Sequence, residues 1–170
     1  MRFRLLAAAA LAMAFSATAA MAAPAPRLAV QSLSQLADLP YPFDAERDAN
    51  ADVAAASARA QAEGKLLLID LGGNWCPDCR ILAGIMDLPE MKVFLAAHYV
   101  MVTVDIGHLD KNLQIPARYG IIAGIAAAPA VLIVDPGTDA LIDRGHILPF
   151  DDMQSSAPQP IADWLAKWTN

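Results

Sequence analysis

Several features that would direct a protein toward other functions are scarce in this sequence. Its 170 residues include two cysteines and three histidines, and the net charge is −6. An acidic chain is poorly suited to nucleic acid or an anionic membrane surface, so we expect neither as a partner. Scattered histidines without paired ligand spacing disfavour structural zinc, which needs four ligands. The sequence also has no Gly-rich phosphate loop and no hydrolase pattern, and we expect no metal or other cofactor.

The one long apolar run lies at the amino terminus. Arg2 and Arg4 precede an apolar stretch over residues 5–15, and small residues follow. This order is typical of a secretory signal peptide, and Ala20 and Ala22 suit cleavage after residue 22. An uncleaved anchor is the alternative, although the alanine-rich composition favours insertion only weakly. We therefore expect a periplasmic protein whose mature chain, with a net charge of −8 after loss of both arginines, does not insert into the membrane.

The chain after the signal peptide is long enough for one compact domain. Residues 23–42 predict an extended leader, because they contain Pro24, Pro26, Pro40 and Pro42. We expect little order before Tyr41, apart from one helical turn near residues 33–36. Residues 43–170 are predicted to form the domain, which we expect to be a monomer.

The apolar pattern of the domain predicts alternating helices and strands. Apolar runs without alternation, typical of strands covered on both faces, occupy residues 66–71, 99–106 and 130–134. Helices are expected over residues 52–63, 77–98 with a break at Pro89, 112–119 and 161–168. A last strand over residues 140–146 follows a Pro-Gly turn. This order predicts an α/β sandwich with a parallel first pair of strands and a final hairpin.

Both cysteines lie in the segment Gly73-Asn74-Trp75-Cys76-Pro77-Asp78-Cys79. A disulfide between positions three apart closes a very small loop and adds little stability, so a reversible dithiol is the better interpretation. The segment follows a predicted strand and opens a predicted helix. The unpaired N–H groups at the start of that helix favour a thiolate, which makes Cys76 the expected nucleophile and Cys79 the resolving thiol.

With its Trp-Cys-Pro-Asp-Cys centre, this sequence resembles the thioredoxin-like superfamily, and specifically its exported single-domain members. The resemblance covers about residues 52–168 and implies a three-layer α/β/α sandwich around a mixed sheet of four to five strands. It also implies that Asp70, six residues before Cys76, lies beneath Cys79 and transfers its proton. The position of Asp70 inside an apolar strand independently predicts burial and a raised pKa.

The resemblance also implies how a substrate chain would be held. Pro129 is expected to have a cis peptide bond and to pack against the dithiol, leaving the backbone of Ala128 to pair with the substrate as an added strand. We expect Trp75 to be a partly exposed platform beside Cys76. Pro77 fixes the first helical turn, where its missing N–H leaves no partner unsatisfied.

Three features of this chain bear on direction and substrate. Asp78 places a carboxylate between the cysteines and should oppose thiolate formation at Cys76, which favours the disulfide at equilibrium and a reducing potential. Thr103 stands where the family often has a lysine near the buried acid, so Asp70 lacks a cationic partner. Residues 121–127 form a longer, alanine-rich approach to Pro129, which predicts a reshaped substrate-facing loop.

These observations predict an exported thiol–disulfide oxidoreductase, acting as a reductase on disulfide-containing exported proteins. Because an oxidising compartment would keep Cys76 and Cys79 as a disulfide, we expect a membrane-embedded thiol transporter as the electron donor. The alternative is a binding module, a metal carrier or chaperone, that uses the dithiol as a ligand or local staple. Disulfide isomerisation ranks lower, because residues 24–50 are short for a dimerisation segment.

Overall fold

A four-stranded sheet in the order β2-β1-β3-β4 forms the centre of the computed structural model, which describes residues 22–36, 38–144 and 157–169. The strands are β1 (Leu66–Gly72), β2 (Tyr99–Asp105), β3 (Ala130–Asp135) and β4 (Ala140–Leu141). β1 and β2 are parallel, whereas β3 is antiparallel to β1 and to β4. The predicted parallel first pair and final hairpin are therefore confirmed.

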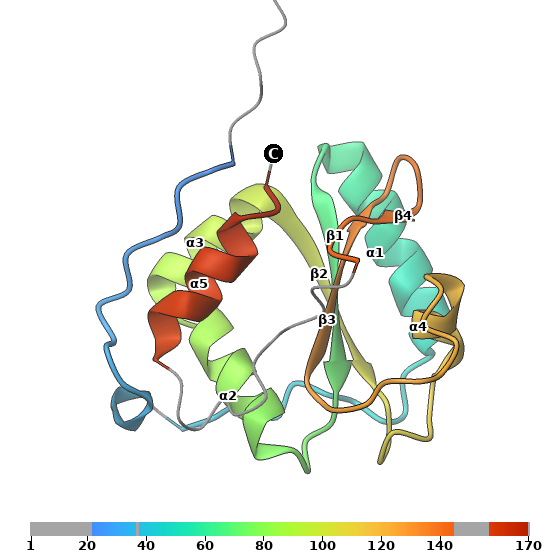
Figure 1. The fold of residues 1–170 in the computed structure, drawn as a ribbon, viewed down its shortest axis with the longest axis horizontal. Helices are drawn as coiled ribbons and strands as arrows, with labels where there is room; N and C mark the ends of the chain where they lie inside the picture. Colours follow the sequence, from blue (N-terminus) through green and yellow to red (C-terminus); the bar gives the residue numbers. More distant parts are fainter. Residues whose placement is uncertain (1–21, 37, 145–156, 170) are drawn as a thin grey trace, which may run out of the picture.

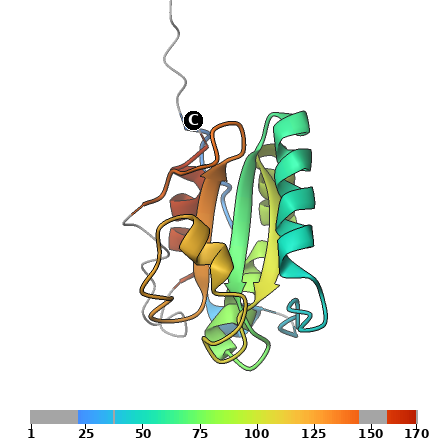
Figure 2. The same cartoon turned by 90° about the vertical axis from the view of Figure 1, so that its right-hand side faces the viewer.

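Helices cover both faces of this sheet, which gives the expected three layers (Figure 1). The helices on one face are α2 (Pro77–Met86), α3 (Pro89–His98) and α5 (Pro158–Ala166), and those on the other are α1 (Ala49–Glu63) and α4 (Gln114–Arg118). The view along the other direction shows α1 lying flat against β1 and β2 (Figure 2). Because side chains alternate along a strand, Leu68 packs into one layer while Leu67 and Ile69 pack into the other.

The helices begin and end where capping residues allow, and these positions differ from those that the apolar pattern predicts. α1 begins at Ala49, earlier than predicted, because the Asp48 carboxylate accepts hydrogen bonds from the N–H groups of Asn50 and Ala51. It ends at Gly64, whose φ of 64° suits glycine. The predicted break at Pro89 is confirmed, since α2 and α3 are separate helices.

The last strand is shorter than predicted. β4 has two residues, and one further backbone bond, from the N–H of Ile142 to the carbonyl of Ile133 at 2.9 Å, follows it. The cause is the buried side chain of Asp143, which accepts the N–H of Ile133 at 3.1 Å and so takes a position that a main-chain carbonyl would hold in a longer ladder. The remainder of the predicted strand, residues 145 and 146, lies outside the described residues.

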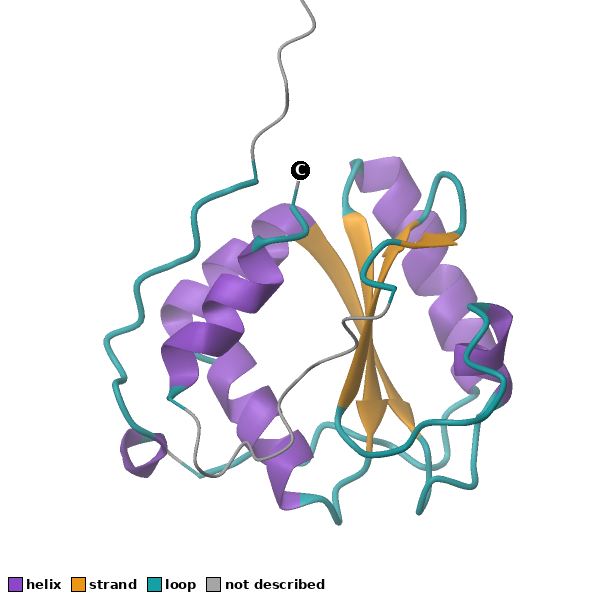
Figure 3. Ribbon diagram, viewed as in Figure 1, coloured by secondary structure: helices purple, strands orange, loops and turns teal. Residues whose placement is uncertain are grey.

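The leader packs against the domain, and the expectation of little order before Tyr41 is wrong for its described residues. Leu28 is 5% exposed and belongs to the apolar cluster under α2, α3 and α5. Gln159 of α5 accepts from the N–H of Leu28 and donates to the carbonyl of Pro26. One 3-10 turn, Leu33–Gln35, confirms the predicted helical turn. The prolines keep this segment extended, and Figure 3 draws it as a teal loop with one purple turn. Its leucines still bury apolar surface against the domain.

The predicted signal peptide, residues 1–22, lies outside the described residues except for Ala22. Among the helices that the structure describes, none is long and apolar enough to cross a membrane. Export and cleavage after residue 22 stay predictions.

Candidate active site

The dithiol lies at the turn from β1 into α2, as the sequence predicts. Cys76 caps α2: its Sγ accepts the N–H of Cys79 at 3.3 Å, and Pro77 occupies the first helical position. Gly72 ends β1 in a space with no room for a side chain, because an added Cβ would lie 2.8 Å from Sγ of Cys79 and 2.7 Å from the ring of Phe43. The N-terminus of α2 thus directs the Cys79 N–H at the Cys76 sulfur, where the helix dipole favours negative charge.

The two cysteines differ in environment. Both are reduced, with exposures of 5% for Cys76 and 0% for Cys79. Burial raises the pKa of the Cys79 thiol far above its usual range, and its contact with Cys76 raises that pKa further. Cys76 is the cysteine at the rim and Cys79 the one beneath, which is the order that attack followed by resolution requires.

Asp70 is fully buried, as predicted. It is 0% exposed, and neither carboxylate oxygen has a hydrogen-bond partner among the described residues. Burial without a partner raises its pKa from 3.8 to about 7. Its negative charge in turn raises the pKa of Cys79, so the two groups interact electrostatically. A carboxyl group that changes charge near neutral pH beside a thiol can accept and return a proton.

With threonine in place of the lysine, Asp70 has no cationic hydrogen-bond partner in the part of the chain that the structure describes. Thr103 lies directly opposite Asp70 in the register of β1 and β2. Its hydroxyl donates to the carbonyl of Pro42 at 3.2 Å, so it is directed at the leader and not at the acid. The strand position that the family uses for charge compensation is thus used here to hold the chain before the domain.

The peptide bond between Ala128 and Pro129 is cis, as predicted, and it lies beside the dithiol. The Cys76 thiol donates to the carbonyl of Ala128 at 3.4 Å. Pro129 is buried and Ala128 half-buried, and Ala128 packs on the cluster formed by both cysteines and Phe43. A client backbone that pairs with Ala128 would therefore be next to the Cys76 sulfur.

Trp75 is a partly exposed platform, in agreement with the prediction. It is 45% exposed, its Nε1 donates to the carbonyl of Gly107 at 2.6 Å, and its ring stacks on that of His108 with centroids 4.6 Å apart. The scattered histidines had no predicted role beyond surface or strand-end positions, so this contact of His108 was not predicted. The available signal was topological, because neighbouring parallel strands end at the same edge of a sheet and bring the residues after β2 next to those after β1.

Asp78 occupies the first turn of α2 and is half-buried. Its Oδ1 atom is buried without a hydrogen-bond partner in the described part of the chain. The carboxylate therefore gains little besides the helix dipole, and its charge remains available to oppose a negative charge on Cys76.

Three residues of the site were not found from the sequence: Phe43, Asn74 and Arg80. Phe43 is 4% exposed and belongs to the same apolar cluster as both cysteines. Asn74 joins the backbone of Phe43 by two hydrogen bonds, and Arg80 bonds the leader just before it. Phe43 is the first apolar aromatic residue after the prolines, which was the one signal that could have drawn attention to it.

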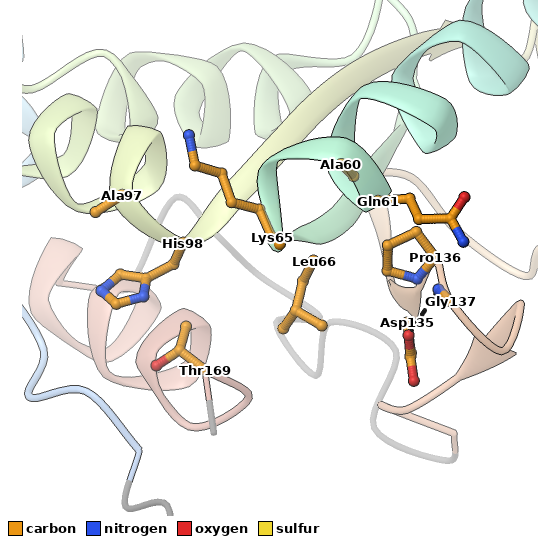
Figure 4. Close-up of a pocket in the computed structure, with 11 residues that line it drawn as sticks. Ala60, Gln61, Lys65, Leu66, Ala97, His98, Asp135, Pro136, Gly137 and Thr169 are labelled. Atoms are coloured by element: carbon orange, nitrogen blue, oxygen red, sulfur yellow. Dashed lines mark hydrogen bonds between the residues drawn. The ribbon is translucent and has the colours of Figure 1, made fainter.

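Nothing in the described residues points to a resident metal, since no group of three or more His, Cys, Asp or Glu side chains is placed to hold one. His98 lies at the end of α3, in the wall of a hollow of about 430 Å³ together with Lys65 and Asp135 (Figure 4). This hollow adjoins the start of β1 at Leu66, whereas the dithiol follows the end of the same strand. It is therefore separate from the redox centre. His146 lies outside the described residues.

Comparisons with known proteins agree with this geometry. The sequence model of a thioredoxin-like family matches residues 48–136. A disulphide isomerase from Xylella fastidiosa Temecula1 is 31% identical, with a TM-score of 0.67, over 78% of this chain and 99% of that one. A mutant thioredoxin from Halobacterium salinarum NRC-1 is 13% identical with a TM-score of 0.44, over 77% and 96% of the two chains. The search of curated proteins found no match.

The chain belongs to the thioredoxin-like family and has its fold. Thiol–disulfide oxidoreductase activity is supported at the level of the family.

Proposed function

We propose that this protein is an exported thiol–disulfide oxidoreductase that reduces disulfides of partner proteins through Cys76 and Cys79. The observation that carries the proposal is the position of Cys76, whose sulfur lies at the N-terminus of α2 and within 3.4 Å of the Ala128 carbonyl. The same atom is thus offered a thiolate-stabilising helix end and a backbone to which a client can pair.

The reaction begins when the Cys76 thiolate attacks one sulfur of a partner disulfide. A bond forms between Cys76 and that sulfur, and the partner's second sulfur leaves as a thiolate, which takes up a proton. Cys79 then loses its proton to Asp70 and attacks Sγ of Cys76. The partner's first sulfur is expelled and receives the proton back, so that the partner gains two thiols and Cys76 and Cys79 become a disulfide.

The reductase direction rests on charge. Asp78 and Asp70 both place negative charge near the dithiol, and in the described residues no side-chain cation pairs with Asp70. Negative charge disfavours the thiolate of the reduced form, and so favours the disulfide and makes the dithiol the better reductant. Sustained reduction in the periplasm then requires electrons, which we assign to a membrane-embedded thiol transporter; we expect the mature protein to act as a monomer on exported proteins.

Isomerisation is the second candidate, because the Xylella structure, 31% identical over almost its whole length, is described as a disulphide isomerase. An isomerase uses the same attack by Cys76 but is released by a thiol of the client. Recovery of activity by a protein with scrambled disulfides, in a buffer without net reductant, distinguishes the two roles.

Reduction of insulin by dithiothreitol tests the proposal. The protein should accelerate precipitation of the insulin chains, and Cys76→Ser should return the rate to that of dithiothreitol alone. Absence of acceleration by the unmodified protein would remove the enzyme assignment. The equilibrium potential against glutathione tests the direction: a value near that of the strong oxidants, about −120 mV, contradicts a reductase.

A further inference from the structure

Residues 39–43, here called the strap, cross the redox centre just before the domain begins. Four of their five carbonyl groups accept hydrogen bonds from side chains of the domain. Arg80 donates to the carbonyls of Leu39 and Pro40 at 2.7 and 3.1 Å. Its guanidinium also lies 3.7 Å from the centre of the Tyr41 ring. An extended segment without a ladder of its own is thus held at nearly every residue.

The donors that hold the strap are the neighbours of the redox groups. Arg80 follows Cys79, and Thr103, which donates to Pro42, lies opposite Asp70. Asn74 stands two residues before Cys76, and its side chain accepts the N–H of Phe43 at 3.1 Å and donates to the carbonyl of Phe43 at 2.6 Å. The strap is therefore fastened to the dithiol turn, to α2 and to the strand beside the acid.

The side chain that these bonds position is Phe43. It is 4% exposed and shares with both cysteines a cluster separate from the two large apolar cores. The ring edge of Phe43 and Sγ of Cys79 approach the same point beside Gly72. Pro40 and Pro42 form part of the wall of a cavity of about 350 Å³ that reaches Asp70. Phe43 thus adjoins Cys79, and Pro40 and Pro42 border the cavity that reaches Asp70.

We propose that the strap is a positioning element of the redox centre, in which Phe43 excludes water from Cys79 so that this cysteine remains a neutral thiol until Cys76 is bound to a client. The mechanistic consequence rests on the proposed function, because only a resolving cysteine needs such protection. The strap itself, with the sequence Leu-Pro-Tyr-Pro-Phe, brings no acidic or basic side chain. The titratable groups that act on Cys79 are Cys76 and Asp70, so removing the ring of Phe43 changes solvation and not charge.

The test is alkylation of the reduced protein by iodoacetamide between neutral pH and about pH 10, with each cysteine quantified by mass spectrometry. Phe43→Ala should speed alkylation of Cys79 by about tenfold throughout this range, as a fall of about one unit in its pKa would do, because the whole range lies below the pKa of the protected thiol. Cys76 should change less than about twofold, because it already lies at the rim. Phe43→Leu, which retains an apolar cover, should restore the Cys79 rate to within about twofold.

Phe94→Ala is the matched control. It removes a ring of the same size that is 7% exposed and belongs to the apolar cluster under α2, α3 and α5. An equal rise at Cys79 in this variant would mean general loosening and would overturn the proposal, as would an unchanged Cys79 rate in Phe43→Ala. Should Phe43→Ala fail to fold, Asn74→Ala cuts both bonds to Phe43 and leaves the ring in the chain. It should raise Cys79 alkylation severalfold, and no rise would also overturn the proposal.

Alkylation does not depend on catalysis. If the unmodified protein does not accelerate insulin reduction, the proposed function is contradicted. The alkylation rates alone then decide whether water is excluded from Cys79. Conversely, a normal rate of insulin reduction together with rapid alkylation of Cys79 in the unmodified protein would contradict the proposed role of the strap and would not affect the proposed function.

Discussion

The dithiol lies between two segments that are held in different ways. The strap on one side is bonded through its carbonyls and buries Phe43. Residues 121–128 on the other side make, apart from the Ile121 N–H, no backbone–backbone hydrogen bond with the described chain, and they leave Ile122 85% exposed. We infer two tasks from this difference: the fastened side keeps water from Cys79, and the open side is the one from which a client would approach Cys76, whose exposure is 5%.

The largest effect on activity should come from removing either sulfur, because attack requires Cys76 and resolution requires Cys79. Cys79→Ser should accumulate a mixed disulfide between Cys76 and the client, since attack proceeds but resolution does not. Cys76→Ser should form none. Non-reducing electrophoresis followed by peptide mapping measures this. A client trapped on Cys79 in Cys76→Ser would reverse the assignment of the open and the covered side.

Asp70, beneath the covered side, should make stability depend on pH. Burial raises its pKa from 3.8 to about 7, so the folded protein binds the proton more tightly than the unfolded chain. Stability from this group is present below about pH 4 and is lost as the pH rises to about 7. This shift corresponds to at most roughly 4 kcal/mol at 1.36 kcal/mol per pH unit.

Asp70→Asn should remove that dependence. Measured by urea unfolding at several pH values, the free energy of unfolding of the unmodified protein should fall relative to the variant between about pH 4 and about pH 8. Because other carboxylates titrate equally in both proteins, the difference isolates Asp70. Parallel profiles would mean that Asp70 is solvated in the folded protein.

The exposed side should contribute to client affinity. Ile122→Asp should raise KM for insulin by about tenfold, since burying an isoleucine side chain is worth roughly 1.5–3 kcal/mol and only part of it would be covered by a client. The thermal midpoint should not change, because the side chain is 85% exposed.

Val93→Asp is the control for this change. Val93 is 74% exposed on α3, in the other helical layer, so an added charge there should leave KM unaltered. An equal rise in KM in the two variants would reflect repulsion from the acidic protein as a whole and would contradict a role of residues 121–128 in client binding.

Asp78 should have the smallest effect. Asp78→Asn removes a negative charge in the first turn of α2, favours the thiolate of Cys76 and so stabilises the reduced form. Since a charge near a helix end is typically worth less than about 1 kcal/mol, the potential should become roughly 10–20 mV more positive. Equilibration with glutathione measures this. A more negative potential would show that Asp78 acts through the helix dipole and not on Cys76.

Much of the site could be predicted because it depends on local spacing. Cys76 and Cys79 share one helical turn, Asp70 lies within the preceding strand, and Pro129 opens the strand paired with it. Residues in one strand–turn–helix unit reach their relative positions through backbone geometry alone. The burial of Asp70 is confirmed for this reason, whereas the cis bond before Pro129, which is also confirmed, was implied by the family resemblance.

The strap could not be predicted in the same way. Its prolines do predict an extended chain, which is what the structure contains. They do not show where an extended chain lies, because that depends on donors 31 to 61 positions away, at Asn74, Arg80 and Thr103. The contact of Trp75 with His108 has the same origin, since it forms only when two parallel strands end side by side.

By itself, therefore, the sequence determined the chemistry of the dithiol, the burial of the acid in the preceding strand and the alternation of helices and strands, which follow from short-range spacing and apolar patterning. The place of that acid beneath Cys79 was implied by the family resemblance. The tertiary structure alone decided which cysteine is covered and by what. Solvent exposure is a property of the packed chain, and here a segment that looked like a linker supplies the ring that contacts Cys79. The exposure of a thiol depends on long-range contacts, and so does its reactivity.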